Sequence, residues 1–547
     1  MDPVNALGLL ASAFGRLQSI ETWHASTMPK KGIPALDTKA AGAMPWYRQG
    51  MVCIIRPLCA VLGLALLIAP APSPAVAQAG SGSALHLMPC VEGRTRVSAY
   101  CGTFRVYENR TAHAGRTIVL HLIVLHAKHR GHRAIYVNLG GPGAPTLPAA
   151  AGLTDGAFLK ELAVLRDRYD IILLDNRGMG ASHPLNCDLA PPAHPAVYLR
   201  QLWPSALLSA CHARRAAQSD LRQYTTVNAA DDLDELRAAL GYPKMVLDGG
   251  SYGTYFSLVY AQRHPAHVES LVLQGVVPPR LPETFIGFAP AAQAALDKLA
   301  AECEADASCH AHFPQFRAHF AALAARLNRE PIPVLVRNGA TKRVVTVALS
   351  KQVFVDTVRH VLYDIGAAAY VPYVVEQEYR GNTLPLGTLI DDTVQGFAQG
   401  LDDGALLSYS CAEYVPFVTE TEIRASSAGT FMGDTRVRAQ QQACKIWSVP
   451  PGPSSVAQPI RIGAPVLMIS GTNDPATPPA YSAEQLRYLP NAGRVLVRGA
   501  SHVTQTACTD RLIVAFVLQR SAKGLPLNSC SAAFSRPPFA TSSAGLP

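Results

Sequence analysis

The sequence predicts an α/β protein with a mostly parallel sheet, helices on both faces of that sheet and an inserted, mainly helical segment. From about residue 115, short apolar runs alternate with amphipathic segments, which is typical of parallel strands joined by helices. The alternation stops over residues 280–455, which are rich in alanine and carry helix-like stretches, and strand-like runs return after them. We therefore expect the chain to leave its sheet for a long insertion and to rejoin it for the last two strands.

The expected strands and helices follow from apolar periodicity and from turn and capping signals. Strands are predicted over residues 118–125 (near the sheet edge), 134–139, 169–174, 245–248, 271–275, 466–470 and 494–497. A helix is predicted over residues 227–240, with Thr226 as its N-cap and Gly241 as its stop. Further helices are expected from the turn at residue 251 to about 264, over 289–304 and over 315–328.

The composition is that of a large folded protein. Hydrophobic residues make up 49% of the 547 residues and charged residues 16%, which is ample for a sizeable core and argues against disorder. We expect an N-terminal extension and signal peptide at 1–77 and a first part of the sheet domain at 85–279. A helical cap at 280–455 and the C-terminal part of the sheet domain at 456–535 follow.

The charge of the chain does not point to a nucleic-acid partner. The formal net charge is +9, and removal of residues 1–77 leaves 42 basic and 36 acidic groups, or +6. This is a mild excess without a dense basic run, so no nucleic-acid partner is predicted. The sequence leaves the oligomeric state open.

The segment from Met51 to residue 77 has the three parts of a signal peptide. Arg48 and Arg56 supply its positive region, residues 58–69 form an apolar core, and residues 75–77 are an A-x-A cleavage site. The alternative is a transmembrane anchor, but the apolar run is short for a span, which takes ~20 residues. We expect an exported protein, periplasmic or extracellular, without stable membrane association after cleavage, whose synthesis starts at Met44 or Met51.

The cysteine count agrees with export. Ten cysteines lie beyond the signal segment, at positions 90, 101, 187, 211, 303, 309, 411, 444, 508 and 530. An even number in an oxidising compartment indicates disulfides, and proximity along the chain favours pairing in sequence order. The alternative is zinc binding, but no C-x-x-C pair is present. Neither a metal nor an organic cofactor is predicted.

A candidate nucleophile lies directly after a predicted strand and before a predicted helix. Residues 249–253 fit G-x-S-x-G, with Ser251 at the centre. In this context the serine sits on a strained strand-to-helix turn that small neighbours permit, and the helix N-terminus points amides at a developing oxyanion. The alternative is an ordinary turn, in which glycine and serine are common. The context favours a nucleophile.

A serine hydroxyl needs a base to accept its proton, and an acid to orient that base. In the α/β-hydrolase fold the acid and the histidine follow the serine in that order, on loops after the last strands. Asp474 follows the strand 466–470 and His502 follows the strand 494–497. The carboxyl ends of these strands meet at the same sheet edge as Ser251, so we expect these three residues to form a catalytic triad.

The loop after the strand 134–139 is the expected second half of an oxyanion hole. It carries G-G-P-G at residues 140–143, in which glycines let the backbone approach a substrate and proline stiffens the turn. We expect the amides of Gly141 and Tyr252 to bind the oxyanion. The alternative is a plain tight turn.

Four motifs in this order resemble those of the prolyl-aminopeptidase-like α/β-hydrolases. They are G-G-P-G at 140–143, D-N-R-G-M-G-A-S at 175–182, G-G-S-Y-G at 249–253 and D-P-A-T-P at 474–478. The sequence is most similar to the secreted tripeptidyl-aminopeptidase branch, with its paired cysteines around Cys90 and Cys101, over roughly residues 88–532. The resemblance implies a serine exopeptidase that removes residues from peptide N-termini, with a cap closing the cleft.

The sequence departs from the family pattern at three positions. Leu139 stands where the family often has histidine, Asn176 where it often has glutamine, and Ser501 where a glycine usually precedes the base. These departures bear on substrate positioning rather than on the triad.

An aminopeptidase must also hold a protonated α-amine, which in a desolvated cleft requires a carboxylate. In the enzymes that this sequence resembles, acidic cap residues do this. Glu413 is the candidate, since a disulfide from Cys411 would brace it. The alternative is a solvated surface glutamate.

The sequence therefore predicts an exported serine hydrolase, in which His502 takes the Ser251 proton and Asp474 orients the imidazole. Its expected activity is that of an aminopeptidase acting on peptides through an acyl-enzyme. An esterase or lipase using the same triad and a non-enzymatic binding protein on a hydrolase scaffold are the two alternatives. The number of residues released per cleavage is left open.

Overall fold

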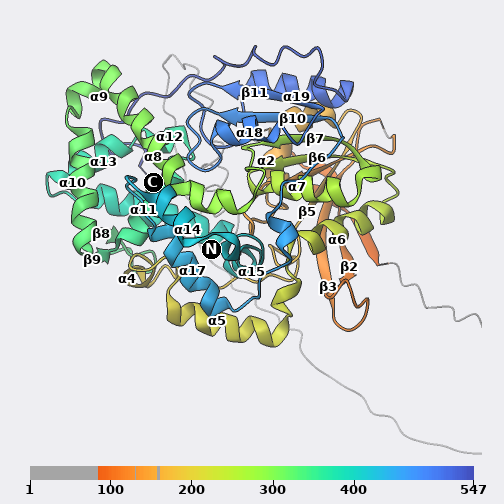
Figure 1. Cartoon of the computed structure of the whole chain (residues 1–547), viewed down its shortest axis with the longest axis horizontal. Helices are drawn as coiled ribbons and strands as arrows, with labels where there is room; N and C mark the ends of the chain where they lie inside the picture. The colour runs from red at the N-terminus through yellow and green to blue at the C-terminus, as the bar shows by residue number, and fades with distance from the viewer. Residues whose placement is uncertain (1–83, 130, 157–159, 547) are drawn as a thin grey trace, which may run out of the picture. The chain divides into compact units, whose positions relative to one another are not determined.

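A computed structural model of the chain describes residues 84–129, 131–156 and 160–546. Its main feature is a nine-stranded sheet with the order β1-β2-β3-β5-β4-β6-β7-β10-β11 (Figure 1). The strands are β1 (Leu85–Glu92), β2 (Val97–Tyr107), β3 (Thr117–Leu125), β4 (Ala134–Asn138), β5 (Asp170–Leu174), β6 (Met245–Gly250), β7 (Val268–Gln274), β10 (Val466–Gly471) and β11 (Ala492–Val497). The predicted extension and signal peptide at 1–77 lie outside the described residues.

Strand pairing divides the sheet into an antiparallel and a parallel part. β1, β2, β3 and β5 pair antiparallel, whereas β5, β4, β6, β7, β10 and β11 pair parallel. The seven predicted strands are all present, but the position of the first near the sheet edge needs correction. β1 and β2 lie outside β3, and their half-exposed pattern lacks the continuous apolar run that reveals a buried strand.

Helices cover both faces of the sheet, because alternate residues of its strands point to opposite sides. In β5, Ile171 belongs to the apolar cluster that contains Phe516 of α19 (Ala507–Gln519), whereas Ile172 belongs to the cluster that contains Phe256 of α7 (Tyr252–Arg263). The helices that cover the sheet are α2 (Ala149–Thr154), α3 (Lys160–Leu165), α6 (Thr226–Ala239), α7 (Tyr252–Arg263), α18 (Pro479–Gln485) and α19 (Ala507–Gln519). Two helices from the connection between β5 and β6, α4 (Pro195–Tyr198) and α5 (Ser205–Gln218), pack instead against the segment inserted between β7 and β10. The predicted fold class is confirmed.

Helix α6 begins one residue earlier than predicted, with Thr225 rather than Thr226 as its N-cap. The Thr225 side chain accepts a hydrogen bond from the amide of Asn228. The Thr226 hydroxyl is engaged elsewhere, with Glu413 and the Tyr252 hydroxyl.

The segment between β7 and β10 is mainly helical and contributes no strand to the nine-stranded sheet. Its helices are α8 (Pro282–Ala305), α9 (Ala307–His312), α10 (Phe316–Arg329), α11 (Lys351–Val361), α12 (Ile365–Ala368), α13 (Val371–Tyr379), α14 (Leu384–Gly400), α15 (Asp403–Glu413), α16 (Glu420–Ser427) and α17 (Thr435–Trp447). It also holds an antiparallel hairpin, β8 (Ile332–Arg337) and β9 (Val344–Leu349), which the sequence analysis did not anticipate. β8 packs against α14 and β9 against α4 (Figure 1). The cap boundaries at 280 and 455 stay predictions.

This insertion has an apolar core of its own. Phe320 of α10, Val334 of β8 and Phe354 of α11 are buried in a cluster separate from the two clusters that flank the large sheet. The hairpin was missed because it lies inside a segment that carries helix-like stretches and no clear alternation of strands and helices.

Five disulfides join the ten cysteines in sequence order, as predicted. The pairs are Cys90–Cys101, Cys187–Cys211, Cys303–Cys309, Cys411–Cys444 and Cys508–Cys530. The fourth links α15 to α17. Within the described part of the chain, no helix is both long and apolar enough to cross a membrane.

Candidate active site

Ser251 occupies a sharp turn between β6 and α7. Its backbone has φ 54° and ψ −124°, a conformation that non-glycine residues adopt only under strain. The glycines on either side make the turn possible. A Cβ on Gly249 would lie 2.3 Å from the carbonyl oxygen of Gly253, and one on Gly253 would lie 2.2 Å from that of Asn138. The local sequence thus forces the Ser251 side chain out of the sheet edge, as in a nucleophile elbow.

Asp474 and His502 form a buried pair at the ends of β10 and β11. The imidazole Nδ1 lies 2.8 Å from Asp474 Oδ2, and both side chains are almost fully excluded from solvent. Asp474 Oδ1 accepts the amides of Ala476 and Thr477, each at 2.8 Å, and the Thr477 hydroxyl donates to Oδ2 at 2.7 Å. The same hydroxyl lies 3.2 Å from His502 Nδ1. Every donor around this carboxylate favours its charged form.

Opposing effects therefore act on Asp474. Burial raises the pKa of its carboxyl, but the facing His502 and the hydrogen bonds from Thr477 and Ala476 outweigh burial and hold the pKa below its ordinary value. The carboxylate is thus ionised at neutral pH and can stabilise an imidazolium at His502.

The three predicted triad residues lie at one sheet edge, where Ser251 and His502 line the same cavity of about 220 Å³. We call it the Ser251 cavity. The Ser251 amide donates to the carbonyl of Gln274 at 2.8 Å, and the next residue, Gly275, leaves room for the imidazole. A Cβ there would lie 3.2 Å from His502 Cε1.

Ser251 Oγ and the His502 imidazole do not form a hydrogen bond in this structure. Ser251 Oγ has no hydrogen-bond partner among residues 84–129, 131–156 and 160–546. Catalytic hydrogen bonds of this kind often tighten only when a substrate binds.

The glycine loop at 140–143 packs directly against the elbow. A Cβ on Gly140 would lie 2.8 Å from the Gly250 carbonyl oxygen and 3.0 Å from Ser251 Cβ. Gly141 lines the Ser251 cavity. Tyr252 is the first residue of α7, so its amide has no acceptor within the helix. Both predicted oxyanion amides are therefore carried by segments that meet at Ser251.

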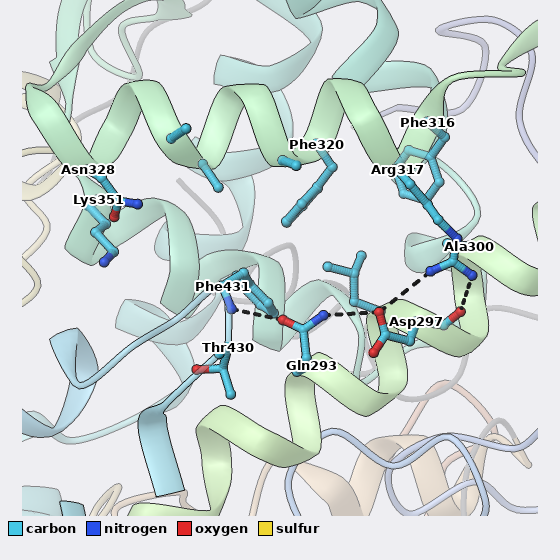
Figure 2. A pocket seen from close by; sticks show the side chains of 15 residues that line it. Gln293, Asp297, Ala300, Phe316, Arg317, Phe320, Asn328, Lys351, Thr430 and Phe431 are labelled. Carbon is cyan, nitrogen blue, oxygen red and sulfur yellow. Dashed lines mark hydrogen bonds and ion pairs between the residues drawn. The ribbon is translucent and has the colours of Figure 1, made fainter. Parts of the chain in front are cut away.

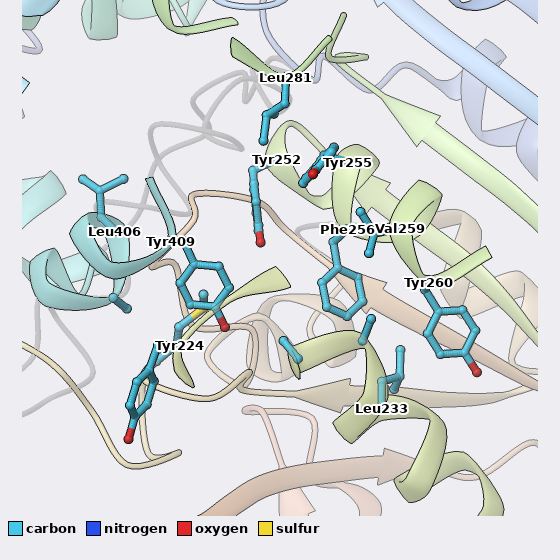
Figure 3. Packing of buried hydrophobic residues seen from close by; sticks show 14 of the residues in the cluster. Tyr224, Leu233, Tyr252, Tyr255, Phe256, Val259, Tyr260, Leu281, Leu406 and Tyr409 are labelled. Atoms are coloured by element: carbon cyan, nitrogen blue, oxygen red, sulfur yellow. The ribbon is translucent and has the colours of Figure 1, made fainter. Parts of the chain in front are cut away.

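The Tyr252 side chain points away from the cavity into the core. Its ring packs edge-on against that of Tyr409 of α15, with centroids 6.1 Å apart, and lies near Tyr255 (Figure 3). Only the Tyr252 backbone is thus available for an oxyanion.

The motif at 175–182 braces this arrangement rather than lining it. Asp175 accepts the amides of Thr146 and Leu147 at 2.7 and 2.9 Å, which fixes the chain that continues the glycine loop. Arg177 is fully buried and donates to both oxygens of Asp232 on α6 at 2.6 and 2.7 Å. These bonds tie the end of β5 to the loop and to α6.

Glu413 does not line the Ser251 cavity. It is buried at the end of α15, where its two carboxylate oxygens accept the Thr226 amide and hydroxyl, each at 2.6 Å. Burial raises the pKa of Glu413 to about 7, although these hydrogen bonds lower it. The solvated-surface alternative is wrong, and the observed contacts hold the first turn of α6 instead of facing the cavity.

Four charged residues from the insertion line the Ser251 cavity and were not assigned to the site from sequence. They are Asp356 and Arg359 of α11, Asp403 of α15 and Arg436 of α17. No local motif surrounds these residues, so the only available signal was their charge within an otherwise apolar, helical segment.

Tyr363 and Ser501 connect α11 to the histidine loop. The Tyr363 ring packs on the His502 imidazole with centroids 4.5 Å apart, and its hydroxyl accepts a hydrogen bond from Arg359. The Ser501 hydroxyl donates to the carbonyl of Leu362. The serine that replaces the usual glycine thus holds this loop against the end of α11.

A second cavity, of about 330 Å³, lies within the insertion between α8 and α10. Figure 2 shows Phe320 and Phe431 along it, with Lys351 and Arg317 at different ends. Arg317 is already bound to Glu304 at 2.6 Å and lies 3.6 Å from Asp297. The lining contains neither a serine nor a histidine, so it offers no comparable nucleophile and base.

Two groups of side chains in the described part of the chain have the geometry of metal ligands, and both are otherwise engaged. Cys90 and Cys101 of the first form a disulfide. In the second, with His264 and His267, Asp234 Oδ1 already accepts hydrogen bonds from Arg237 and Tyr260, each at 2.9 Å. Neither group lines the Ser251 cavity.

Comparison with known proteins identifies the family. A family model described as the alpha/beta hydrolase fold matches residues 145–506. The chain belongs to the α/β-hydrolase family. As an α/β-hydrolase with the elbow described above, it is an enzyme of the serine hydrolase and peptidase class.

Curated relatives of this α/β-hydrolase include several peptidases. Serine protease Hip1 of Mycobacterium tuberculosis is 26% identical over 470 residues, which cover 79% of this chain and 88% of the relative. Tripeptidyl aminopeptidase of Streptomyces lividans is 32% identical over 161 residues, 27% of this chain and 29% of the relative. Proline iminopeptidase of Arabidopsis thaliana is 29% identical over 149 residues, 27% of this chain and 28% of the relative. The resemblance predicted from the four motifs is confirmed.

Proposed function

We propose that this α/β-hydrolase is an exported serine aminopeptidase that cleaves short peptides or residues from peptide N-termini. The observation that carries the proposal is the buried Asp474–His502 pair, whose imidazole shares one cavity with Ser251 on its strained turn. The similarity to tripeptidyl aminopeptidase and proline iminopeptidase supports an N-terminal peptidase.

The proposed chemistry is acyl transfer in two steps. His502 accepts the Ser251 proton as the hydroxyl oxygen attacks the peptide carbonyl, and Asp474 stabilises the resulting imidazolium. The amides of Gly141 and Tyr252 bind the oxyanion of the tetrahedral intermediate. His502 then gives its proton to the leaving amine, which leaves an acyl-enzyme. Water, deprotonated by the same imidazole, attacks the ester and releases Ser251.

A free substrate amine requires a carboxylate that faces the cavity. Two carboxylates line it, and Asp356 is occupied by two arginines, which leaves Asp403. The amide of the preceding residue, Asp402, donates to the Gly143 carbonyl at 2.9 Å, so the start of α15 lies against the glycine loop. We therefore infer that Asp403 binds the α-amine of the substrate in place of Glu413, whose two carboxylate oxygens both accept hydrogen bonds from Thr226.

The reaction class is tested with an active-site serine probe on purified protein. We expect stoichiometric labelling of the wild type and none of Ser251→Ala, with Asp167→Asn on an exposed loop as the labelled control. Labelling that survives Ser251→Ala unchanged would overturn the assignment.

The substrate class is tested with a panel of free-amine peptides, the same peptides N-acetylated, and acyl esters. An aminopeptidase prefers the free-amine series, and we expect Asp403→Asn to remove that preference. Equal turnover of blocked peptides and esters would instead make the enzyme an esterase with the same triad.

Export is supported by the five disulfides, which are typical of oxidising compartments. N-terminal sequencing of the mature protein tests it, with Gln78 expected as the first residue. A mature chain that still carries residues 51–77 and stays in the cytoplasm would refute export.

A further inference from the structure

The wall of the Ser251 cavity that comes from α11 and α17 carries more positive than negative charge. Arg359 and Arg436 are 2% and 7% exposed, and the carboxylate between them, Asp356, is 6% exposed. All three line the cavity. Charges this well removed from water are stable only when they are paired.

A single carboxylate oxygen serves both guanidinium groups. Asp356 Oδ1 accepts from Arg359 Nε at 3.2 Å, from Arg359 Nη2 at 2.9 Å and from Arg436 Nε at 3.0 Å. One negative charge therefore faces two positive charges, so the cluster retains an excess of +1.

The other partners of the two arginines are neutral. Arg359 contacts the Tyr363 hydroxyl and His360 Nε2, and Arg436 donates to Gln440 Oε1 at 2.6 Å. Burial lowers the pKa of His360 well below its ordinary value, and the adjacent Arg359 lowers it further, so this imidazole is uncharged at neutral pH.

The remaining carboxylates of the region have other partners or positions. Asp474 faces His502 and Thr477, with the Tyr363 ring between that pair and Arg359. Asp403 is hydrogen-bonded to the indole of Trp203, and the Arg436 guanidinium carbon lies 4.6 Å from the centroid of the same ring. Neither carboxylate forms an ion pair with Arg436.

Arg436 has donors to spare. No residue in the described ranges accepts a hydrogen bond from its Nη2 atom, and this atom is not fully closed off from solvent. Because burial and the neighbouring Arg359 act against its charge, the pKa of Arg436 is lowered despite Asp356. A second anion at this position would satisfy both the open N–H groups and the excess charge.

We propose that Arg436, backed by Arg359, binds a carboxylate of the substrate inside the Ser251 cavity. The inference rests on the proposed peptidase function and narrows its substrates to peptides that bring a carboxylate into the cavity. Two sources share this chemistry: the C-terminal carboxylate of a short peptide, and an acidic side chain near the cleaved bond. With Asp403 for the amine and Arg436 for the acid, the cavity suits a zwitterionic peptide.

The test compares kcat/KM for matched free-amine peptides in three forms. The first ends in a carboxylate, the second in a carboxamide, and the third is a carboxamide with one Glu in place of Gln. We expect wild-type enzyme to prefer one of the two acidic forms over the neutral form by about tenfold, the size of a charge-assisted hydrogen bond. The form that is preferred identifies the source of the carboxylate.

The arginine is tested with Arg436→Gln and a matched surface variant, Arg461→Gln. Arg461 lies on the exposed surface over the Tyr488 ring. We expect Arg436→Gln to reduce the acid-to-neutral ratio about tenfold and Arg461→Gln to leave it unchanged. An equal ratio in wild type and Arg436→Gln would overturn the proposal.

If Arg436→Gln does not fold, the subsite can still be tested on the wild-type enzyme. Peptide acids should inhibit turnover of a neutral substrate at about tenfold lower concentration than their carboxamides, and equal inhibition would refute the subsite. Loss of Ser251-dependent turnover with every peptide would refute the proposed function instead, so the two failures are distinguishable.

Discussion

The Ser251 cavity has two walls that are built in different ways. The sheet-side wall carries Gly141, Ser251 and His502, each on a loop that follows a strand of the large sheet. The cap-side wall carries charged residues on helices of the insertion, namely Asp356, Arg359, Asp403 and Arg436. The first wall is set by strand order, and the second depends on how helices far apart in sequence pack.

The two walls also differ in how their charges are balanced. Behind the sheet-side wall, the Asp474 carboxylate accepts hydrogen bonds from Ala476 and Thr477 and faces the His502 imidazole. Groups of the protein itself therefore stabilise its charge. On the cap side, Arg436 keeps open donors and Asp403 has no ion pair within the described residues. The balanced wall is suited to chemistry and the unbalanced wall to recognition. Changes on the first should alter kcat for all substrates, and changes on the second should alter KM for particular ones.

The largest expected effect is that of Asp474→Asn, which should lower kcat about 10³- to 10⁴-fold for every substrate. The amide group of asparagine would face Nδ1 as a donor and favour the tautomer that carries its proton on Nε2, which leaves no base toward Ser251. Steady-state kinetics on free-amine and N-acetylated peptides measures it.

Asp167→Asn on the exposed surface is the control for this substitution and should leave kcat unchanged. A loss confined to KM in Asp474→Asn would contradict the role of the sheet-side wall.

Asp403→Asn should raise KM for free-amine peptides about 10- to 100-fold, the size of a lost hydrogen bond to a charged group. The reason is that the ammonium would lose the one carboxylate of the described cap-side wall that is not paired with an arginine, whereas N-acetylated peptides carry no ammonium. Kinetics on both peptide series checks this. Glu413→Gln, removed from the cavity, is the comparison. If Glu413→Gln selectively weakens free-amine substrates and Asp403→Asn does not, the original sequence assignment is restored.

The sheet-side wall could be predicted from sequence because its determinants are local. Short sequence patterns predict the strand before Ser251, the glycines around it and the loops after β10 and β11. Strand order then brings Ser251, Asp474 and His502 to one edge. The predicted N-cap of α6, Thr226, was wrong by one residue. The Thr226 hydroxyl has tertiary partners that a local capping pattern does not reveal.

The cap-side wall could not be predicted, because helix faces are chosen by packing. On α15, Tyr409 and Glu413 are four residues apart and share the face that meets Tyr252 and α6, whereas Asp403 and Leu406 share the face that lines the cavity. The disulfide at Cys411 does brace this helix, as expected, but it does not determine which acidic residue points inward.

A smaller effect on the sheet-side wall is expected from Thr477→Val. It removes the hydroxyl that donates to Asp474 Oδ2 at 2.7 Å, and we expect kcat to fall about tenfold with unchanged KM. Thr477→Ser keeps the donor and should restore most of the rate. Equal kcat in the valine and serine variants would show that the hydroxyl does not position the pair, and equal melting temperatures exclude a loss of fold.

The smallest expected effect is a pH dependence confined to free-amine substrates. Burial, followed by the negative charges of Asp402 and Asp188, raises the pKa of Asp403 to about 7. The carboxyl therefore takes up a proton as the pH falls through 7 and loses its attraction for an ammonium. Between pH 7 and pH 6 its ionised fraction falls about fivefold, while an α-amine with a pKa near 7.7 stays mostly protonated. KM for free-amine peptides should rise by about that factor relative to KM for N-acetylated peptides. The other titrating groups of the enzyme affect both peptide series equally and cancel in this ratio. Asp403→Asn should abolish the difference, and a KM ratio that stays constant from pH 7 to 6 in the wild type would remove Asp403 from amine binding.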